Sequence, residues 1–351
     1  FDYNHLPALF RGLEAMSKVL VTGGTGFVGS HLVEKLLEQG RTVRVLALKE
    51  PMDEIEKENE EIVRDAGAEV VYGDLRNPSS LQKATKGCDT VFHLAAISRP
   101  MSIPDKHYYD VNVVGTKNIL EAAQAAGVKK FVHTSTVSVL GVSPDGHPLK
   151  EDEFQYEDQL YGLSKREGEF TALLFHHEHK LPVTVIRPCL VYGPRCIVRR
   201  IMFKYVKLGV FPVFTGGNAK MEFVYVDNVV DALLLAEKNE KAVGEVFNIT
   251  DGQSYKIGEI LNTIADVQDV KRPWIKLHPK TGFYLGAMAE TISRLFGIHP
   301  PFSRTASHWM SEDVNVYDCS YAKKVLGYLP KVNLKDGVER TVSWFEGRGE
   351  L

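Results

Sequence analysis

Short unbroken hydrophobic runs alternate with longer helical patterns along most of the chain, starting at Ser17. Because the runs do not alternate with polar residues, they are typical of strands buried on both faces of a sheet. The alternation predicts an α/β fold in which a doubly wound parallel sheet carries helices on both faces. Strands are predicted at residues 18–22, 43–48, 69–72, 90–94, 130–134 and 183–187.

Helical periodicity lies between these strands, over residues 31–39, 113–126 and 157–179. Gly40 and Gly127 directly follow the first two segments, and glycine at that position is a common signal for the end of a helix.

The regular alternation fades after Pro188, which predicts a second lobe. Further strands are predicted at 223–226 and 246–249, with Asp227 capping a helix over 229–237. We therefore expect a sheet domain over 16–188 to which the chain returns at about 220–249. The smaller C-terminal lobe, for substrate binding, is expected over 189–219 and 250–351. Residues 1–15 carry no periodic pattern and are interpreted as an upstream extension or expression remnant.

Composition narrows the class of protein. The 351 residues include 42 Lys plus Arg and 45 Asp plus Glu, so a net charge of −3 gives no basic field for nucleic acid. No apolar run approaches the roughly 18 residues of a membrane-spanning helix. The four cysteines form no Cys-x-x-Cys pair, which favours the reducing cytoplasm over a disulfide framework or a zinc ribbon. His176 and His179 share a helical face, but nothing completes a metal site, so no metal is expected.

A glycine-rich loop, GGTGFVG at residues 23–29, stands where the first strand is predicted to turn into a helix. Gly23 permits a tight turn, Gly26 lets a pyrophosphate approach the backbone, and Gly29 lets the helix pack closely on the strand. The alternative is a purely structural turn. The strand before the loop and the α/β alternation after it favour a Rossmann-type dinucleotide site.

The end of the second strand bears on the choice between NAD and NADP, because an acid there accepts hydrogen bonds from the ribose of NAD. Ala47 stands there without an acid, and Arg44 and Lys49 carry positive charge nearby. This favours NADP, since both basic groups can bind a 2′-phosphate; the alternative is that both face solvent. Asp74, after the third strand, is expected to accept a hydrogen bond from the adenine amino group or to cap the next helix.

Tyr161 and Lys165 are four residues apart within a predicted helix, so their side chains share one face. An ammonium beside a tyrosine lowers the pKa of the phenol, which would let the pair exchange a proton with a carbonyl. Such a pair is more often a surface contact, but here it follows a dinucleotide loop and a strand that ends in hydroxyl residues, Thr134, Ser135 and Thr136. Hydroxyls at the carboxyl end of a parallel strand point into the ligand crevice.

These features, taken in order, resemble the extended short-chain dehydrogenase/reductase family, which includes NAD-dependent epimerases and dehydratases. The resemblance extends from residue 18 to about 249. Its matching segments are the loop at 23–29, HLAA at 93–96, NVVGTKN at 112–118, the hydroxyl residues, YGLSK at 161–165, and RP with VYGP within 187–194.

The resemblance implies that Tyr161 is the acid/base and that Lys165 holds the nicotinamide ribose and tunes Tyr161. Thr136, five residues before Gly141, would hydrogen-bond the substrate oxygen, with Ser135 as the next candidate. Asn112 would steady the site through backbone or water contacts, or is a buried polar group of a helix. The expected cofactor contacts are Gly23, Thr25, Gly26, Phe27, Val28, Gly29, Arg44, Lys49, Asp74, Leu75, Leu94, Ala95, Ala96, Thr134, Tyr161, Lys165 and Pro188.

The segment before Phe223 bears on the substrate. Nucleotide-sugar members of the family usually carry a basic residue there to meet the diphosphate, whereas this chain has Lys220, Met221 and Glu222. The tail, at 282–304 and 318–330, resembles the 3β-hydroxysteroid dehydrogenase and sterol-decarboxylating branch. An amphipathic helix is predicted over 282–297. Its apolar face either belongs to the core of the lobe, or forms a pocket wall or an interfacial face for an apolar substrate.

The leading hypothesis is an NAD(P)-dependent oxidoreductase for a hydroxyl or ketone of a steroid-like or long-chain substrate. The alternative is a nucleotide-sugar epimerase or dehydratase that uses the same tyrosine; a non-enzymatic cofactor sensor is less favoured because Tyr161 and Lys165 are present. The expected partners are a small-molecule substrate and a second copy of the chain in a homodimer.

Overall fold

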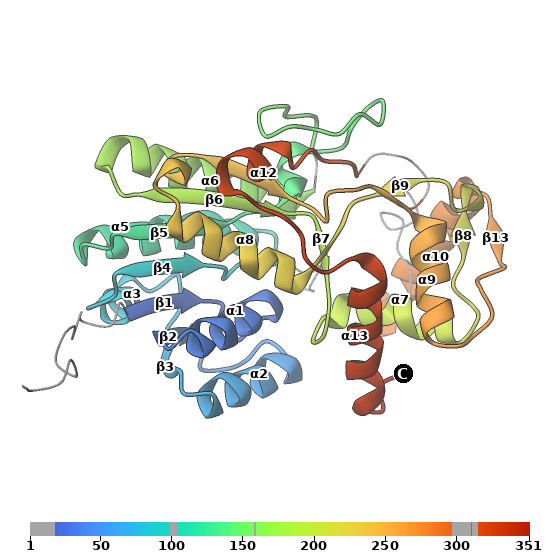
Figure 1. Cartoon of the computed structure of the whole chain (residues 1–351), viewed down its shortest axis with the longest axis horizontal. Coiled ribbons are helices and arrows are strands. Elements are labelled where there is room, and N and C mark those ends of the chain that lie inside the picture. The colour runs from blue at the N-terminus through green and yellow to red at the C-terminus, as the bar shows by residue number, and fades with distance from the viewer. Residues whose placement is uncertain (1–17, 99–103, 158, 297–309, 311–314) are drawn as a thin grey trace, which may run out of the picture.

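The computed structural model describes residues 18–98, 104–157, 159–296, 310 and 315–351. Its central sheet has seven parallel strands, and the strand order reverses between β1 and β4 (Figure 1). This confirms the predicted α/β fold with a doubly wound sheet, in which ligands bind beyond the carboxyl ends of the strands at the reversal. The order is β3 (Glu69–Tyr72), β2 (Thr42–Ala47), β1 (Lys18–Thr22), β4 (Thr90–His93), β5 (Lys130–Thr134), β6 (Val183–Pro188) and β11 (Val246–Ile249).

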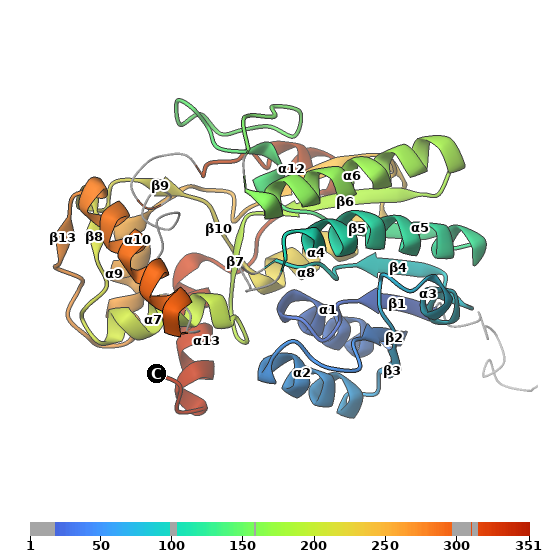
Figure 2. The same ribbon diagram turned by 180° about the vertical axis from the view of Figure 1, so that it is seen from behind.

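Helices cover both faces of this sheet, as the two opposite views show (Figures 1 and 2). Continuous apolar strands require this arrangement, because each face needs its own cover. One face carries α1 (Phe27–Glu38), α2 (Glu54–Asp65), α8 (Val226–Lys238) and α12 (Ser320–Leu326), and the other carries α3 (Pro78–Thr85), α5 (Thr116–Ala125) and α6 (Leu160–His179).

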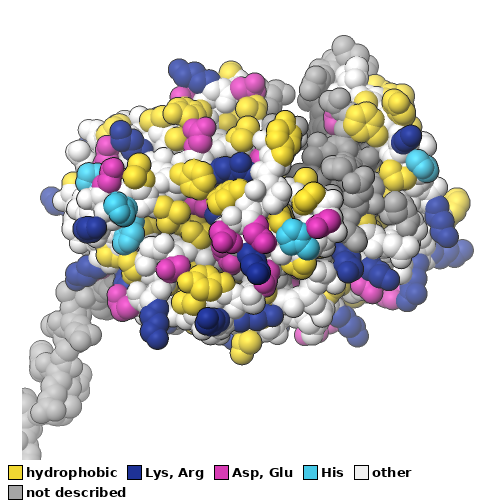
Figure 3. All heavy atoms as spheres, turned by 90° about the horizontal axis from the view of Figure 1, so that it is seen from above, with side chains coloured by type: hydrophobic (Ala, Val, Ile, Leu, Met, Phe, Trp, Pro, Cys, Tyr) yellow, Lys and Arg dark blue, Asp and Glu magenta, His cyan; other side chains and the backbone are white. Residues whose placement is uncertain are grey.

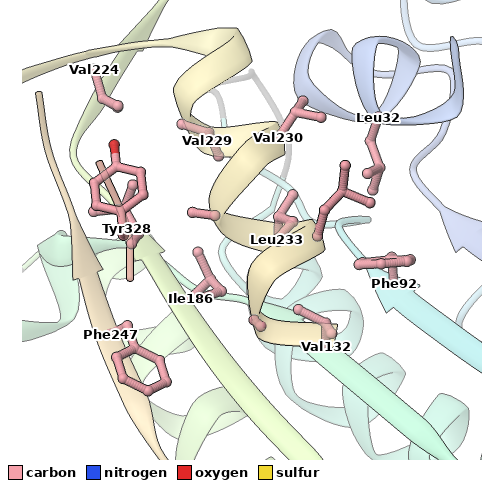
Figure 4. Packing of buried hydrophobic residues seen from close by; sticks show 14 of the residues in the cluster. Leu32, Phe92, Val132, Ile186, Val224, Val229, Val230, Leu233, Phe247 and Tyr328 are labelled. Atoms are coloured by element: carbon pink, nitrogen blue, oxygen red, sulfur yellow. The ribbon is translucent and has the colours of Figure 1, made fainter. Parts of the chain in front are cut away.

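Helix α8 belongs to the sheet domain although it follows part of the second lobe in the chain. Val229, Val230 and Leu233 point from α8 toward the sheet, where Phe92 and Ile186 lie (Figure 4). All five side chains are buried. Burial of each such side chain contributes about 1.5–3 kcal/mol, so this face fixes the returning segment on the sheet.

The second lobe contains short paired strands and helices beside the carboxyl edge of the sheet (Figures 1 and 2). Its core includes Phe203, Val206, Ile260, Ile264 and Val338. The strand pairs are β7 (Leu190–Tyr192) with β10 (Phe223–Tyr225), β8 (Val213–Phe214) with β13 (Lys276–Leu277), and β9 (Lys220–Met221) with β12 (Tyr255–Lys256); the helices are α7 (Ile197–Lys207), α9 (Ile257–Val267), α10 (Pro279–Phe296) and α13 (Leu334–Gly347).

The structure corrects the prediction for the segment around Asp227. Strand β10 pairs with β7 rather than with the main sheet, so only α8 and β11 return to it. Asp227 does not cap α8, because the helix begins at Val226 and Asp227 lies in its first turn. An acidic side chain in the first turn still stabilises the helix, because it lies near the positive end of the helix dipole.

Other helices begin elsewhere than the periodicity predicted. Helix α1 begins at Phe27, directly after Gly26, and α6 begins at Leu160. The segment 110–115, expected partly within one helix, forms a π-helical turn before α5, preceded by the short α4 (Lys106–Tyr109). Predicted strand ends differ from the observed ones by one residue at β2, β4, β6 and β10.

The C-terminal tail is divided between the two parts of the molecule. Tyr317, Ala322, Leu326 and Tyr328 pack into the core of the sheet domain, although the tail was expected to lie in the second lobe. Small and apolar side chains on α12 account for this placement beside α8 and β11. The proposed extension at 1–15 and the expected contacts of 297–304 lie outside the described residues. In the described part of the chain, no helix is both long and apolar enough to cross a membrane.

Candidate active site

The glycine loop makes a tight turn between β1 and α1. Gly23 has a φ of +70°, and a Cβ there would lie 2.7 Å from the amide nitrogen of Ala95. A Cβ on Gly29 would overlap the carbonyl oxygen of Gly23. Gly26 precedes α1 and contributes no side-chain cap. The first turn of α1 therefore presents backbone amides of the kind that bind a phosphate.

Asn59 of α2 supports this loop and was not found by the sequence analysis. Its Nδ2 donates a hydrogen bond of 2.9 Å to the carbonyl oxygen of Thr25, and both residues are buried. The bond fixes the peptide that follows Thr25, whose nitrogen belongs to Gly26. No motif marks Asn59, because it lies 34 residues further along the chain.

Tyr161 of α6 lies near Thr136, the residue before the short helical turn 137–140 that follows β5. Burial raises the pKa of Tyr161 to about 12, and the nearby Thr136 hydroxyl opposes part of that rise. The structure does not show the expected lowering of this pKa by Lys165. Burial has the larger effect, because it disfavours the phenolate.

Lys165 approaches the same site from the next turn of α6. Its Nζ donates a hydrogen bond of 2.8 Å to the carbonyl oxygen of Thr134. Burial lowers the pKa of Lys165 to about 8, while the Glu169 carboxylate acts in the opposite direction. A lysine with this pKa exchanges protons near neutral pH.

Asn112 ties three segments of the site together from the π-helical turn. Its Oδ1 accepts a hydrogen bond of 2.8 Å from the amide of Ile97, and its Nδ2 donates to the carbonyl oxygen of Ile97 and to Ser164 Oγ. Ser164 Oγ in turn donates to the carbonyl oxygen of Tyr161. Asn112 therefore joins the backbone of Ile97 to α6, which it reaches through Ser164 Oγ.

A buried ion pair anchors α6 to β6. Arg187 and Glu169 form a bidentate pair that is closed to solvent, and Arg187 Nη1 donates a 2.7 Å hydrogen bond to the carbonyl oxygen of Glu151. Breaking a buried pair by removing one partner leaves an uncompensated charge. The pair thus holds the helix that carries Tyr161.

Two hydroxyls at the carboxyl end of β5 fit a polar ligand. Thr134 Oγ1 and Ser135 Oγ are buried and have no hydrogen-bond partner among the described residues. Buried polar atoms normally find a partner, so these two mark a place that a ligand or water completes. Together with the glycine loop and Lys165, they form a site that suits a dinucleotide.

Arg44 does not lie where the expected contact to a 2′-phosphate requires it. It stands within β2, in register with Glu69, and pairs with that carboxylate at 3.1 Å. Its Nη1 also donates to the carbonyl oxygens of Ala84 and Lys86, at 2.7 and 2.9 Å. A guanidinium at the end of α3 is stabilising, which explains why Arg44 is held there.

Lys49 and Asp74 follow the carboxyl ends of β2 and β3. Lys49 is exposed, two residues after β2 ends at Ala47. The Asp74 carboxylate accepts hydrogen bonds from the amide and guanidinium of Arg76, which lower its pKa. Asp74 does not cap α3, because Asn77 performs that role.

The other expected cofactor residues lie at the carboxyl edge. The amide of Leu94 donates to the carbonyl oxygen of Thr22, and that of Ala95 donates to Thr22 Oγ1. Ala96 follows in the chain, and Pro188 ends β6. Leu75 is buried, and its carbonyl oxygen accepts a hydrogen bond from Asn118. His176 and His179 lie at the end of α6, and the described residues include no group of three that could hold a metal.

The turn after β7 fastens the second lobe to α1. His31 Nε2 lies 3.2 Å from the carbonyl oxygen of Pro194, and Arg195 donates to Ser30 Oγ and to the Glu34 carboxylate. Arg195 has a φ of +69°, which is costly for a residue with a side chain. These contacts hold the lobe close to the first turns of the helix that follows the glycine loop.

Comparison with known sequences agrees with this geometry. A profile of the NAD dependent epimerase/dehydratase family matches residues 19–250. The chain belongs to that family. The match covers the glycine loop, Thr136, Tyr161 and Lys165, and family members of known activity include dehydrogenases and epimerases, so the chain is an enzyme of the extended short-chain type.

Named relatives include enzymes that act on sterols. The chain is 30% identical to the mouse sterol-4-alpha-carboxylate 3-dehydrogenase, decarboxylating, covering 96% of this chain and 93% of the mouse protein. It is 29% identical to the Arabidopsis thaliana 3beta-hydroxysteroid-dehydrogenase/decarboxylase isoform 2, of which it spans only 61%.

A solved structure similar to this chain is the UDP-glucuronic acid 4-epimerase from Bacillus cereus in complex with NAD. The two chains are 25% identical and have a TM-score of 0.75, with 94% of this chain and 99% of the epimerase covered.

Proposed function

We propose that the protein is an NAD(P)-dependent oxidoreductase that acts on a hydroxyl or ketone of an apolar, steroid-like or long-chain substrate. The observation that carries the proposal is the bond from Lys165 Nζ to the carbonyl oxygen of Thr134, which places Lys165, with Tyr161 one turn before it on α6, at the carboxyl edge of a sheet with a glycine-rich loop. Thr136 lies close to Tyr161 at this edge. When bound, the cofactor supplies or accepts a hydride, and the chain's own residues handle the proton.

In this proposal Tyr161 exchanges a proton with the substrate oxygen, while Thr136 donates a hydrogen bond to the same oxygen. Tyr161 holds its proton firmly in the structure, because burial raises its pKa to about 12. That suits an acid that protonates a developing alkoxide. Lys165, with a pKa lowered to about 8 by burial, can return the proton at neutral pH.

The segment before β10 supports an apolar substrate over a nucleotide sugar. Met221 and Glu222 are both buried there. Glu222 Oε1 accepts a hydrogen bond from Ser254, and burial raises the pKa of this carboxyl to about 7. A thioether and a carboxyl group cannot attract a diphosphate, and an ionised carboxyl would repel it. Names of relatives that act on sterols point in the same direction.

The second candidate is a nucleotide-sugar epimerase. It is favoured by the likeness to the UDP-glucuronic acid 4-epimerase, which was solved with NAD, and by Lys220 near the same segment. An epimerase returns the hydride to its substrate within one cycle, so it consumes no added cofactor.

The experiment is a screen that follows absorbance of the reduced nicotinamide with sterols, 3-hydroxy acids, ketones and UDP-sugars. Net oxidation or reduction of added cofactor with an apolar substrate is the expected result. Sugar conversion without net cofactor change would establish the epimerase instead. Cofactor binding without either reaction would overturn both enzymatic proposals and favour a non-enzymatic cofactor sensor.

We also infer that the enzyme favours NADP slightly over NAD. Strand β2 ends at Ala47 without an acid, and Lys49 is exposed beyond it. Arg44 no longer supports this preference. The inferred compartment is the cytoplasm, because all four cysteines are free and buried.

A homodimer is proposed on the outer face of α6. Phe170 and Leu174 are 47% and 56% exposed there, four residues apart on one helical face. Sedimentation of the parent and of a Phe170→Glu, Leu174→Glu variant tests this proposal. A parent that sediments as a monomer would overturn it.

A further inference from the structure

His93 is the last residue of β4, and both nitrogens of its buried ring have hydrogen-bond partners. Nδ1 lies 2.7 Å from Thr22 Oγ1, and Nε2 lies 3.1 Å from Thr116 Oγ1. Thr22 ends β1 directly before the glycine loop, and Thr116 directly follows the π-helical turn that contains Asn112. The ring therefore joins the strand that carries the cofactor loop to the segment that packs against α6.

The partners of Thr116 determine which ring nitrogen of His93 carries a proton. Thr116 Oγ1 donates its only proton to the carbonyl oxygen of Asn112, 2.7 Å away, so it accepts from Nε2 of His93. In the neutral ring Nδ1 then has no proton, and it accepts from Thr22 Oγ1. Thr22 Oγ1 accepts in turn from the amide of Ala95. These groups form one chain of hydrogen bonds, in which each donor points away from Ala95 and toward Asn112.

The carbonyl oxygen of Asn112, where this chain ends, lies against α6. In an α-helix this oxygen would accept from the amide of Thr116, but that amide donates to the carbonyl oxygen of Val113. The Thr116 hydroxyl takes its place. Gly168 of α6 packs so closely on the same oxygen that a Cβ there would overlap it. Because Gly168 lies three residues after Lys165, the place of this carbonyl limits how closely Lys165 approaches the carboxyl edge.

We propose that Thr116, held by His93, is a positioning residue that sets the place of Lys165 relative to the bound cofactor. The inference rests on the proposed function and adds to it a support of α6 from residues that do not touch the substrate. A buried hydroxyl between two fixed partners allows little displacement, since losing either partner is costly. A misplacement of about 1 Å in an active site can cost about 100-fold in rate, so the support should be visible in kcat.

The test removes the Thr116 hydroxyl while keeping the shape of the side chain. In Thr116→Val, kcat with the substrate found in the screen should fall about tenfold or more. The Kd for NADPH should stay within about twofold, because the glycine loop that would bind the phosphates is unchanged. Thr116→Ser keeps the hydroxyl and should recover most of kcat.

Thr85→Val is the matched control. Thr85 is a buried threonine of α3 whose Oγ1 donates to the carbonyl oxygens of Leu81 and Ala122, at 3.0 and 3.3 Å. Its replacement should lower the melting temperature about as much as Thr116→Val does, with kcat unchanged. An equal loss of kcat in Thr85→Val, or a Thr116→Ser variant no better than Thr116→Val, would assign Thr116 to stability alone and overturn the proposal.

Hydrogen exchange in the protein without substrate tests the positioning independently of activity. In Thr116→Val, the amides of residues 160–170 in α6 should exchange about tenfold faster than in the parent, whereas Thr85→Val should leave this segment unchanged. Unchanged exchange in Thr116→Val would overturn the proposal. If the absorbance screen finds no turnover, the proposed function fails, while the exchange of this segment still decides whether Thr116 positions α6.

Two replacements of His93 test the two halves of the chain. The amide of His93→Gln can reach the position of Nε2 and donate to Thr116, whereas that of His93→Asn reaches only toward Thr22. His93→Gln should therefore keep more of kcat than His93→Asn. The reverse order would show that the bond to Thr116 does not carry the effect.

Discussion

Asn59 of α2 donates a hydrogen bond to the carbonyl oxygen of Thr25, inside the glycine loop. Removing the donor leaves that carbonyl without its partner and frees the peptide before Gly26. We expect Asn59→Leu to raise the Kd for the dinucleotide about tenfold, which corresponds to about 1.4 kcal/mol. Fluorescence titration with NADH and NADPH measures this effect.

Asn77→Ala is a suitable control for that variant, because Asn77 caps α3 and does not contact the loop. It should lower the melting temperature while leaving the Kd unchanged. An Asn59→Leu variant with the Kd of the parent would show that the loop holds its shape without α2.

The second prediction concerns the hydroxyl of Tyr161, the proposed acid/base. Tyr161→Phe removes the oxygen that transfers the proton, so kcat should fall about 100-fold or more while cofactor affinity is kept. Steady-state kinetics with the substrate found in the screen measures kcat. Activity within a few-fold of the parent would remove Tyr161 from the proposed role.

A third prediction separates chemistry from packing at Thr136. Thr136→Ser keeps the hydroxyl and should lose little of kcat/KM, whereas Thr136→Ala should lose about tenfold or more. Similar losses in the two variants would point to the methyl group and hence to packing. The comparison is informative because Thr136 also begins the turn over 137–140, where its Oγ1 accepts from the amide of Ser138.

The glycine loop and the position of Tyr161 and Lys165 on one face of α6 could be predicted because they depend on local geometry. A strand that turns into a helix needs Gly23 and Gly29 at fixed positions, and a spacing of four places two side chains on one helical face. Contacts across the fold have no such local signal. The pattern contains nothing that ties Asn59 to Thr25.

Arg44 is a residue for which the sequence predicted a contact that the fold does not make. Its charge suggested a phosphate ligand, but the strand register sets it beside Glu69 and the end of α3. The apolar run at β10 likewise predicted a strand correctly, yet its partner is β7 in the second lobe. Composition identifies an element or a charge, whereas the packing of distant segments decides what it contacts.

The cofactor preference gives a fourth prediction. Ala47→Asp should lower kcat/KM for NADP and raise it for NAD, because the carboxylate repels a 2′-phosphate and accepts hydrogen bonds from the free ribose hydroxyls. Arg44→Gln is the control and should leave the ratio of the two values unchanged, since Arg44 is held by Glu69 and α3. A parent that prefers NAD about tenfold, or about 1.4 kcal/mol, would remove Lys49 from the proposed contacts.

Buried histidines predict how stability depends on pH. His93 is fully enclosed, with Nδ1 2.7 Å from Thr22 Oγ1 and Nε2 3.1 Å from Thr116 Oγ1. Burial lowers the pKa of His93 to about 3 and that of His31 to about 4, and it also lowers the pKa of His133. The folded chain keeps these rings neutral, while the unfolded chain protonates them below pH of about 6.5.

The unfolded state therefore binds more protons as the pH falls from about 6.5 toward 4, and the free energy of unfolding decreases over that window. Each of these histidines contributes about 1.4 kcal/mol per pH unit. In His93→Asn, the free energy of unfolding should fall less steeply with pH, because one of the three buried histidines no longer contributes to the slope. The variant should also be less stable than the parent at pH 7.5. Urea unfolding at pH 7.5, 6 and 5 measures the slope, with the exposed His177→Gln as control. Parallel slopes for the parent and His93→Asn would show that His93 is protonated in the folded protein as readily as in the unfolded one.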